Sequence, residues 1–358
     1  MKTLLGEHLD FSSGNRAPPR AVDGRFPVYG SNGAIGSAAE RNASGPLIVV
    51  GRVGSNCGSL RYCDSDVWVT ENALVCRAKN PLETRYWYYA LHTCRLGDHR
   101  SGSGQPLLNQ RILHDVSVCT IAADERQHVA ELLGALDDKV AANERVIEAA
   151  ERLMVAHAES VVDRVRLSSL AVPSATFRDV REFGERVAHF SLPAFDDGAK
   201  PRLVDGRSVK SGKLLLSAPC VLFAKLNPRI PRIWNVVSLP PDMAVASTEF
   251  VVLRPLGVDS SALWSALRQP DVSLRVRQRA AGTSGSHQRI QPRDLLDVAV
   301  PDVRRLSRAA LQAITSLGAL CHARRAESTR LSGLRDALLP LLVSGRVRVS
   351  DTDPPGTL

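Results

Sequence analysis

One stretch of the sequence has the residue types of a phosphate-binding loop. It reads LIVVGRVGSNCG from Leu47 to Gly58, an apolar, strand-like run that breaks into closely spaced glycines around Arg52. Glycines after a strand let the backbone turn sharply, and the N–H groups of such a turn can hold a phosphate. The stretch therefore raises two hypotheses, the active-site loop of an enzyme and a contact with a polyanion.

The partner motifs that a nucleotide-dependent enzyme needs are missing. The run SGKL at Ser211 to Leu214 lacks the Ser or Thr that follows the lysine of a Walker A loop and holds magnesium. Paired carboxylates in a strand context, which a nuclease needs for magnesium, are not apparent. The nine histidines never stand at HxxxH or HExxH spacing. We expect no catalytic residue, no cofactor and no metal.

The charge of the chain favours a polyanionic partner. The net charge is +9 over 358 residues, and only seven of the 46 basic residues are lysine. Arginine has a planar fork that grips phosphate and reads guanine edges. Double-stranded DNA is the expected partner, and a merely basic protein from a GC-rich genome is the alternative.

Location signals point to the cytoplasm. The start, MKTLLGEHLDF, has no sustained apolar segment, and no run reaches the ~18 apolar residues of a spanning helix. Seven cysteines without a CxxC pair are typical of reduced intracellular thiols. We expect a cytoplasmic protein without membrane contact.

The chain contains an internal repeat. VTENALVC, starting at Val69, is answered by STEFVVLR, starting at Ser247, so that Thr70 and Thr248 are 178 residues apart. NQRI at 109–112 meets HQRI at 287–290 with the same interval, and each leads into a short strand, DVSV or DVAV. Collinear matches of this kind predict two similar globular halves.

Each half is followed by a long helical segment with apolar residues at alternating steps of three and four, the spacing of a coiled-coil seam. The first seam comprises Leu133, Leu136, Val140, Asn143, Ile147, Ala150, Met154, His157 and Val161. The second, less apolar seam comprises Ala310, Ile314, Leu317, Cys321, Arg324, Ser328, Leu331 and Leu338. Asn143 and Arg324 are polar seam residues 181 positions apart, and such residues fix helix register. The alternative is that each faces solvent at a helix end.

The organisation predicted from these patterns is globular segment, long helix, globular segment, long helix. The globular parts mix short β-branched runs with Gly and Pro turns and one short helix each, YWYYALHTCRL and SALWSALRQ. The fold class is therefore α+β. A helix of about 40 residues would be ~60 Å long, more than either globular half needs, so it has the character of a spacer.

Several stretches resemble the specificity subunits of type I restriction-modification systems, and the resemblance covers nearly the whole chain. In the first half they are FPVYGSNGAIG, GPLIVVGRVGSNCG, SGSGQPLLN and LGALDDKVAANERVIE. In the second half they are LLSAPCVLFAKLNPRIPRIW, STEFVVLRP, AAGTSGSHQRI and LRDALLPLLVSGRVRV. The segment CHARRAE in the second helix is a weakened counterpart of the first seam.

The resemblance implies a non-catalytic bacterial DNA reader with a pseudo-twofold repeat. Two target-recognition domains each bind half of a split DNA site, and two long antiparallel helices hold them apart. Two adenine methyltransferase (M) subunits and a translocating restriction (R) nuclease subunit join such a protein. The predicted segments are recognition domains at 1–122 and 166–302, spacer helices at 123–165 and 303–345, and a tail at 346–358.

Residues that the two halves share cannot explain how they read different bases, so shared residues are candidates for phosphate contacts. LIVVGR and CVLFAK align with an interval of 173, which matches Arg52 to Lys225. The shared candidates are Arg52, Lys225, Gln110, Arg111, Gln288 and Arg289. The candidate base readers, which differ between the halves, are Ser55, Asn56, Asn227, Arg229 and Arg232. A salt bridge or a loop-capping role is the alternative for each.

Two other classes of function stay open at this point. An enzyme that uses the glycine loop would show turnover by the isolated chain. A stand-alone DNA-binding or antirestriction adaptor would keep the fold without methyltransferase partners. Neighbouring methyltransferase and helicase-nuclease genes would favour the specificity subunit.

Overall fold

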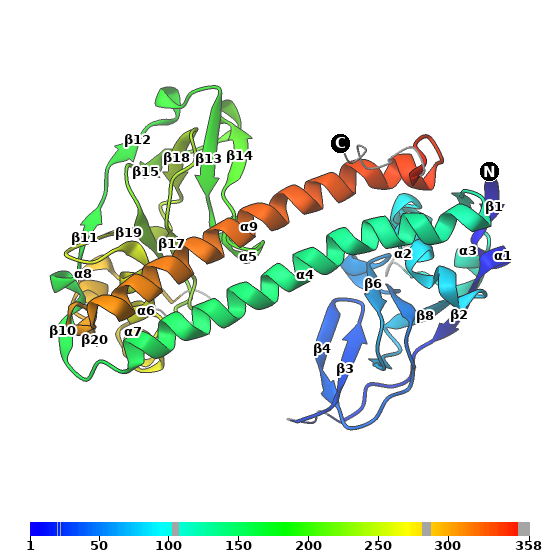
Figure 1. The fold of residues 1–358 in the computed structure, drawn as a ribbon, viewed down its shortest axis with the longest axis horizontal. Coiled ribbons are helices and arrows are strands. Elements are labelled where there is room, and N and C mark those ends of the chain that lie inside the picture. The colour runs from blue at the N-terminus through cyan, green and yellow to red at the C-terminus, as the bar shows by residue number, and fades with distance from the viewer. Residues whose placement is uncertain (20, 22, 102–106, 281–287, 350–358) are drawn as a thin grey trace, which may run out of the picture. The chain divides into compact units, whose positions relative to one another are not determined.

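The computed structural model describes residues 1–19, 21, 23–101, 107–280 and 288–349, and the chain divides into two compact units (Figure 1). Unit 1 comprises Met1–Lys139 and Arg330–Leu358, and unit 2 comprises Val140–Thr329. Both boundaries fall inside long helices, so each unit contains part of both. The small-residue stretches before the two QRI motifs and most of the predicted tail lie outside the described residues.

Unit 1 is built on a four-stranded antiparallel sheet with the order β2-β8-β5-β6. A three-stranded sheet, β4-β3-β7, and a two-stranded sheet, β1-β9, accompany it. The strands are β1 Lys2–Leu4, β2 Leu9–Ser13, β3 Phe26–Gly30, β4 Gly33–Ala38, β5 Leu47–Gly51, β6 Leu60–Cys63, β7 Trp68–Val69, β8 Ala73–Ala78 and β9 Ser117–Cys119. The helices are α1 Leu5–His8, α2 Thr84–Thr93 and α3 Gln110–His114, with 3-10 turns η1 Gly54–Asn56, η2 Pro81–Glu83 and η3 Leu96–His99.

The apolar run at Leu47 forms strand β5 because both of its faces are covered. All five of its residues are buried. Ile48 and Val50 pack into the core that also contains Trp87 of helix α2, whereas Leu47 and Val49 belong to a second core on the opposite face. A strand buried on both sides reads as a continuous apolar run, which is what the sequence shows here.

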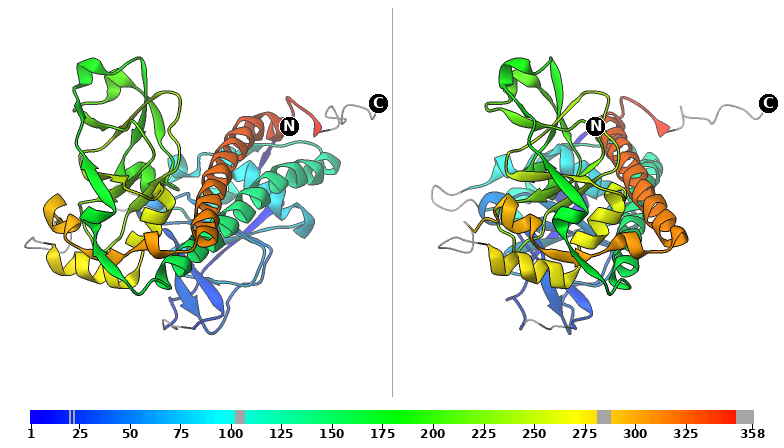
Figure 2. Two further views of the ribbon diagram at one scale, coloured as in Figure 1. Left: turned by 60° about the vertical axis from the view of Figure 1, so that its left-hand side comes forward. Right: turned by 90° about the vertical axis from the view of Figure 1, so that its left-hand side faces the viewer.

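Unit 2 repeats this plan with additions. Its sheets have the orders β11-β19-β16-β17, β12-β15-β18-β13-β14 and β10-β20. The strands are β10 Arg164–Arg166, β11 Ala171–Ser174, β12 Phe177–Arg178, β13 Arg186–Phe190, β14 Arg202–Asp205, β15 Lys213–Leu215, β16 Cys220–Ala224, β17 Ile233–Val236, β18 Met243–Ala246, β19 Phe250–Pro255 and β20 Ala299–Pro301. The helices are α5 Leu192–Asp196, α6 Ser260–Leu267, α7 Pro270–Arg279 and α8 Pro292–Leu296, with 3-10 turns η4 Leu167–Ser169, η5 Val180–Glu182, η6 Gly206–Ser208 and η7 Val303–Arg305. In Figure 2, α6 and α7 are the yellow helices; α7 had no counterpart in the prediction.

The internal repeat is confirmed at the level of strand topology. The sheet β2-β8-β5-β6 corresponds to β11-β19-β16-β17. In both units one strand has an antiparallel neighbour on one side and a parallel one on the other: β3 lies between β4 and β7, and β13 lies between β14 and β18. Strands β12 and β15 extend this second sheet in unit 2 alone among the described residues.

The structure corrects the interval of the repeat at two of the matched motifs. Strands β8 and β19 start 177 residues apart, so Thr70 corresponds to Ser247 and not to Thr248. The same interval separates the donors of two equivalent backbone bonds, from Thr70 N to Tyr29 O and from Ser247 N to Phe190 O, both of 2.8 Å. A one-residue offset places side chains on opposite faces of a strand, so the shared TE letters are not equivalent positions.

The QRI motifs are not equivalent either. Helices α3 and α8 start at Gln110 and Pro292, an interval of 182. Gln110 therefore lies in a helical turn, whereas Gln288 and Arg289 precede the corresponding helix. Aligning the two QRI motifs at an interval of 178 is therefore wrong, because the structural interval here is 182. The shared three letters are a chance identity four residues away from the structurally equivalent position. DVSV and DVAV, 182 apart, are correctly matched.

The two long helices and their antiparallel pairing are confirmed. They are α4, Ala123–Glu159, and α9, Arg308–Val343, each somewhat shorter than predicted because strand β10 and turn η7 occupy the ends. Within unit 2, the Asn143 side chain donates to the Ser328 hydroxyl, and the Cys321 thiol lies 3.8 Å from the Ile147 carbonyl oxygen. Residue numbers therefore increase along α4 where they decrease along α9, which is antiparallel packing. The predicted seam residues are all buried or half-buried, and the buried ones are Leu133, Asn143, Ala150, Met154 and Val161 in the first seam and Ile314, Cys321 and Ser328 in the second. No helix in the described part of the chain is long and apolar enough to span a membrane.

Candidate nucleic-acid interface

The glycine loop after strand β5 is a tight turn closed on itself. The N–H of Gly51 donates to the carbonyl of Ser59 at 2.9 Å, and the N–H of Gly58 donates back to the carbonyl of Gly51 at 2.8 Å. A Cβ atom on Gly51 would lie 2.6 Å from the carbonyl oxygen of Asn56. Gly58 has a φ of 89°, and a Cβ atom on it would lie 2.6 Å from the backbone nitrogen of Gly97. The glycines therefore serve a sharp strand exit, and these two N–H groups are not available to a phosphate.

Arg52 is held at the start of this loop by the sheet. Its N–H donates to the carbonyl of Asn72 at 3.1 Å, and its carbonyl accepts from the N–H of Leu108 at 2.9 Å. Its guanidinium Nη1 lies 3.4 Å from the Ser13 Oγ, which the side chain of Gln110 approaches at 3.3 Å. The structure thus brings Arg52 and Gln110 together around a serine at the end of strand β2, a residue that the sequence patterns did not single out.

Arg111 belongs to the same short helix as Gln110. It is exposed in the first turn of the short helix α3, next to Gln110. The side chain of Asn109 caps that helix by accepting from the N–H of Ile112 at 2.8 Å. The cap explains why NQRI starts a helix here, and the helix presents the two predicted residues to solvent.

Lys225 occupies the position of Arg52 in unit 2. Its N–H donates to the carbonyl of Glu249 at 2.8 Å, and its carbonyl accepts from the N–H of Ile290 at 3.1 Å. These are the counterparts of the two backbone bonds of Arg52. The interval of 173 between the two cations is therefore the true structural register, whatever each side chain contacts.

Three other predicted residues gather around Lys225. Asn227 has a left-handed backbone, with a φ of 50°, and its N–H donates to the carbonyl of Gln288 at 2.8 Å. Arg289 pairs with the carboxylate of Glu249 through contacts of 3.2 and 3.4 Å. About half of the Arg289 side chain is exposed, so the screened ion pair leaves the guanidinium open to another anion.

The remaining arginines of this loop differ in their availability. Arg229 is exposed, and its carbonyl accepts from Arg277 Nη2 at 3.3 Å. Arg232 forms a two-pronged ion pair with Asp196 at 2.6 and 3.0 Å and is only 17% exposed. Reading a base with Arg232 would require breaking that pair. Arg277 belongs to the run RVRQR of helix α7, a basic signal that the sequence reasoning missed.

Ser55 and Asn56 lie in turn η1 at the tip of the glycine loop, and both are exposed. The Asn56 Nδ2 donates to the Asn32 Oδ1 at 2.7 Å. Asn32 belongs to the turn between strands β3 and β4, so this bond joins two loops of unit 1. The two amides line a concavity of about 260 Å³ together with Arg61.

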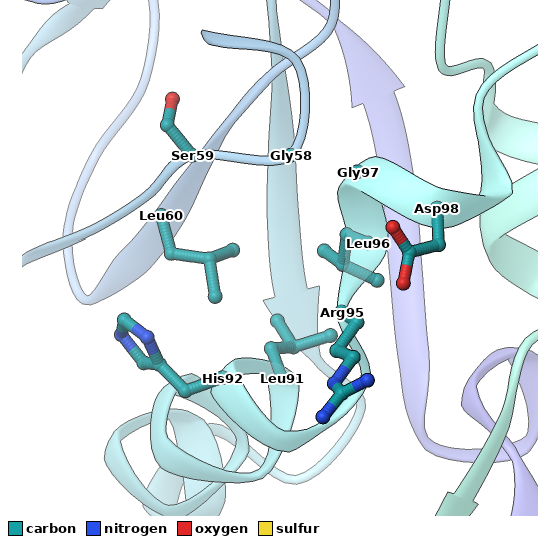
Figure 3. A pocket seen from close by; sticks show the side chains of 9 residues that line it. All are labelled: Gly58, Ser59, Leu60, Leu91, His92, Arg95, Leu96, Gly97 and Asp98. Carbon is teal, nitrogen blue, oxygen red and sulfur yellow. The ribbon is translucent and has the colours of Figure 1, made fainter. Parts of the chain in front are cut away.

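A larger concavity of about 500 Å³ lies beside the glycine loop, between Gly58 and the end of helix α2 (Figure 3). Burial, and then the positive charge of Arg335, lowers the pKa of its His92 below the usual value. In Figure 3, leucine side chains lie between His92 and Asp98. A neutral imidazole separated from the carboxylate does not form an acid–base pair, and the described residues contain no cluster of three or more candidate metal ligands.

The two predicted register residues meet through a third. Asn143 is 1% exposed, and its Nδ2 donates to the Ser328 Oγ at 3.3 Å and to the Glu327 Oε2 at 3.1 Å. Arg324 donates to the same Glu327 oxygen at 2.6 Å. Asn143 is therefore inside the helix pair and not in solvent, while its role in register stays a prediction.

Comparisons with known proteins were made for the whole chain. No family model matches it. The Escherichia coli type I restriction enzyme EcoprrI specificity subunit is 24% identical over 137 residues, which are 38% of this chain and 34% of that protein. The chain thus spans about a third of this curated relative. The crystal structure of the type I restriction-modification S subunit from M. genitalium matches 96% of both chains, with a TM-score of 0.62 and 16% identity. The resemblance and the α+β fold class inferred from the sequence are confirmed.

Proposed function

We propose that this chain, which has the fold of a type I restriction-modification S subunit, is the DNA sequence-specificity subunit of such a complex. The observation that carries the proposal is the fold match over 96% of the chain. The twofold repeat of the loop frameworks supports it, since a split DNA site needs two readers of similar build and different detail.

The shared cations would grip the DNA backbone. Arg52 and Lys225 have the same two backbone bonds in their respective units and lie beside loops that differ. Contacts to phosphate fix the position of a protein on the duplex, and contacts to base edges specify the sequence. Further contacts to the DNA phosphate backbone would come from Gln110 and Arg111 in unit 1 and from Gln288 and Arg289 in unit 2. The two pairs do not occupy equivalent positions in the two units.

The loop tips would read bases. Ser55 and Asn56 in unit 1, and Asn227 and Arg229 in unit 2, are the candidates on these tips. Arg232 is a weaker candidate because Asp196 already engages its guanidinium. Asn suits adenine and Arg suits guanine, because each can form two hydrogen bonds to that base in the major groove.

The long helices would set the distance between the half-sites. Residues 1–122 and 166–302 are proposed as target-recognition domains, and 123–165 and 303–345 as spacers. Helix α4 has 37 residues and so is ~55 Å long. Successive major-groove faces recur every ~34 Å, so helices of this length can hold readers a turn or more apart.

The partners would be two adenine methyltransferase subunits and restriction subunits, in the bacterial cytoplasm. In this arrangement the chain itself carries out no reaction. Methyl transfer and DNA cleavage would belong to the partners, and the chain would place them at its site.

Co-expression with a cognate methyltransferase tests the proposal. The expected result is adenine methylation at one split sequence, mapped by methylome sequencing, while the purified chain alone transfers no methyl group. Methylation by the lone chain would contradict the non-catalytic role. Site-specific DNA binding without any methyltransferase that the chain can direct would instead support a stand-alone adaptor.

A further inference from the structure

Two exposed amides in unit 1 form a bridge between loops that are far apart in sequence. Asn56 lies in turn η1 between strands β5 and β6, and Asn32 lies in the turn between strands β3 and β4. Their side chains are joined by the hydrogen bond of 2.7 Å described above. Both residues are exposed, so the bond is made where an incoming ligand can reach it.

The backbones that carry the two amides are locked together by Ser31. Its hydroxyl donates to the carbonyl of Asn72 and accepts from the N–H groups of Arg52 and Val53 at 3.2 and 3.1 Å. Its carbonyl accepts from the Ser59 hydroxyl at 2.9 Å. The turn next to Asn32 is thus fastened to both ends of the loop that carries Asn56, and the amide pair is held in place before any ligand binds.

The chemistry that remains on Asn56 fits one base. Its Nδ2 carries two hydrogens, of which Asn32 takes one, and its Oδ1 has no partner among the hydrogen bonds of the described residues. One donor and one acceptor on the same planar amide complement N7 and the N6 amino group of adenine in the major groove. Fixing the amide plane by a third group reduces the entropy lost on contact.

We propose that Asn56 reads an adenine in the half-site bound by unit 1, and that Asn32 is the positioning residue that holds its amide for that contact. The inference rests on the proposed function as a DNA reader. It adds the identity of one base and a residue, Asn32, that contributes to specificity through another side chain.

Unit 2 has a different pair in the corresponding loops. There, Arg232 from the β16–β17 loop bonds Asp196 from the connection between β13 and β14. Both units therefore join the same two loops with side chains, but unit 2 uses an ion pair where unit 1 uses a pair of amides. This difference is the kind that readers of unlike half-sites require.

Base selection from randomised duplexes tests the proposal on the full-length chain in its methyltransferase complex. Asn56→Ala and Asn32→Leu are expected to lose the preference for adenine at one position of one half-site, with a fall of about tenfold or more in affinity for the best sequence. Affinity for non-specific DNA should change little. Asn32→Asp keeps an acceptor for Asn56 Nδ2, so it should retain the base preference even where its charge weakens binding to every sequence.

Asp196→Asn is the matched control, since it alters the loop pair of unit 2 and should leave the adenine position intact. A preference for adenine that survives in Asn56→Ala overturns the reading role. Loss of the preference in Asn32→Asp to the same degree as in Asn32→Leu overturns the positioning role. A wild-type complex that selects no sequence would instead refute the proposed function itself. Because Asn32 and Asn56 are exposed, the melting temperatures of the variants at these two positions should match that of wild type.

Discussion

A buried ion pair attaches helix α4 to the core of unit 1, and its removal should be among the most destabilising single changes in that unit. Glu83 and Arg126 are joined at 2.7 Å, with side chains 11% and 9% exposed. Trp87 Nε1 also donates to Glu83 at 3.0 Å, and the Arg126 guanidinium lies 5.0 Å from the centroid of the Trp87 ring. Glu83→Met leaves Arg126 buried without its counter-charge.

The expected loss in the free energy of unfolding is about 3–5 kcal/mol, because a stranded buried charge keeps its desolvation penalty. Arg126→Leu should be comparably damaging, since it strands the carboxylate. The double variant Glu83→Met/Arg126→Leu removes both charges and should recover most of the loss, ending within about 1 kcal/mol of wild type. Calorimetric unfolding of wild type, the two single variants and the double variant gives the coupling energy of this double-mutant cycle.

The exposed pair Glu148–Arg152 on the same helix provides the control. Its side chains are 67% and 72% exposed, so Arg152→Ala should change stability by less than about 0.5 kcal/mol. Simple addition of the two single losses in the double variant would refute the argument, because it would mean that the charges are not coupled. Single losses no larger than that of Arg152→Ala would refute it as well.

The Glu83–Arg126 pair also predicts how the stability of the fold depends on pH. Burial raises the pKa of Glu83, but the hydrogen bonds from Arg126 and Trp87 outweigh it, so the pKa lies below its usual value. A carboxylate with a lowered pKa stabilises the fold above its unfolded pKa of about 4.3, and this contribution is lost as the pH falls through the folded pKa. Unfolding of Glu83→Gln should depend less on pH below about 5 than that of wild type.

Three further outcomes are expected. Arg52→Ala and Lys225→Ala should each weaken binding to all duplexes alike and reduce the slope of log affinity against log salt by about one, measured by anisotropy; loss confined to one base would make the residue a reader. Deleting one heptad from both α4 and α9 preserves the seam and shortens it by ~10 Å, so the methylated sites should lose about three spacer base pairs and keep both half-sites; altered half-site bases would argue against the spacer role. Iodoacetamide at pH 8 should modify exposed Cys119 first, because burial raises the pKa of Cys63 and of the half-buried Cys94 to about 11; a fast thiol remaining in Cys119→Ser would contradict this.

The elements that were predictable from the sequence are those whose pattern extends over many residues. The seam of helix α4 persists for four heptads, so its periodicity exceeds chance and its buried face follows. Strand β5 was predictable because burial on both faces requires a continuous apolar run. Helix α4 ends earlier than predicted because Arg164–Arg166 pairs with strand β20, a partner far away in the sequence.

The register of the repeat could not be obtained from short polar matches. TE and QRI are two and three letters long, and the structural intervals of 177 and 182 differ from 178 by one and four residues. Loops of unequal length between the strands shift each element separately. The match of LIVVGR to CVLFAK was correct because a buried strand restricts every position, whereas an exposed dipeptide restricts none.

The residues that sequence reasoning missed act through tertiary hydrogen bonds. Ser13 ends strand β2, and Ser31 and Asn32 lie in the turn between strands β3 and β4. Each becomes important only when another loop folds against it. The two units agree in the backbone bonds that hold Arg52 and Lys225, and they differ in the side-chain pair that joins the neighbouring loops. A framework maintained by main-chain bonds tolerates new side chains at the loop tips, because those bonds do not depend on side-chain identity. Exchanging the Asn32–Asn56 pair should therefore alter base preference without unfolding unit 1.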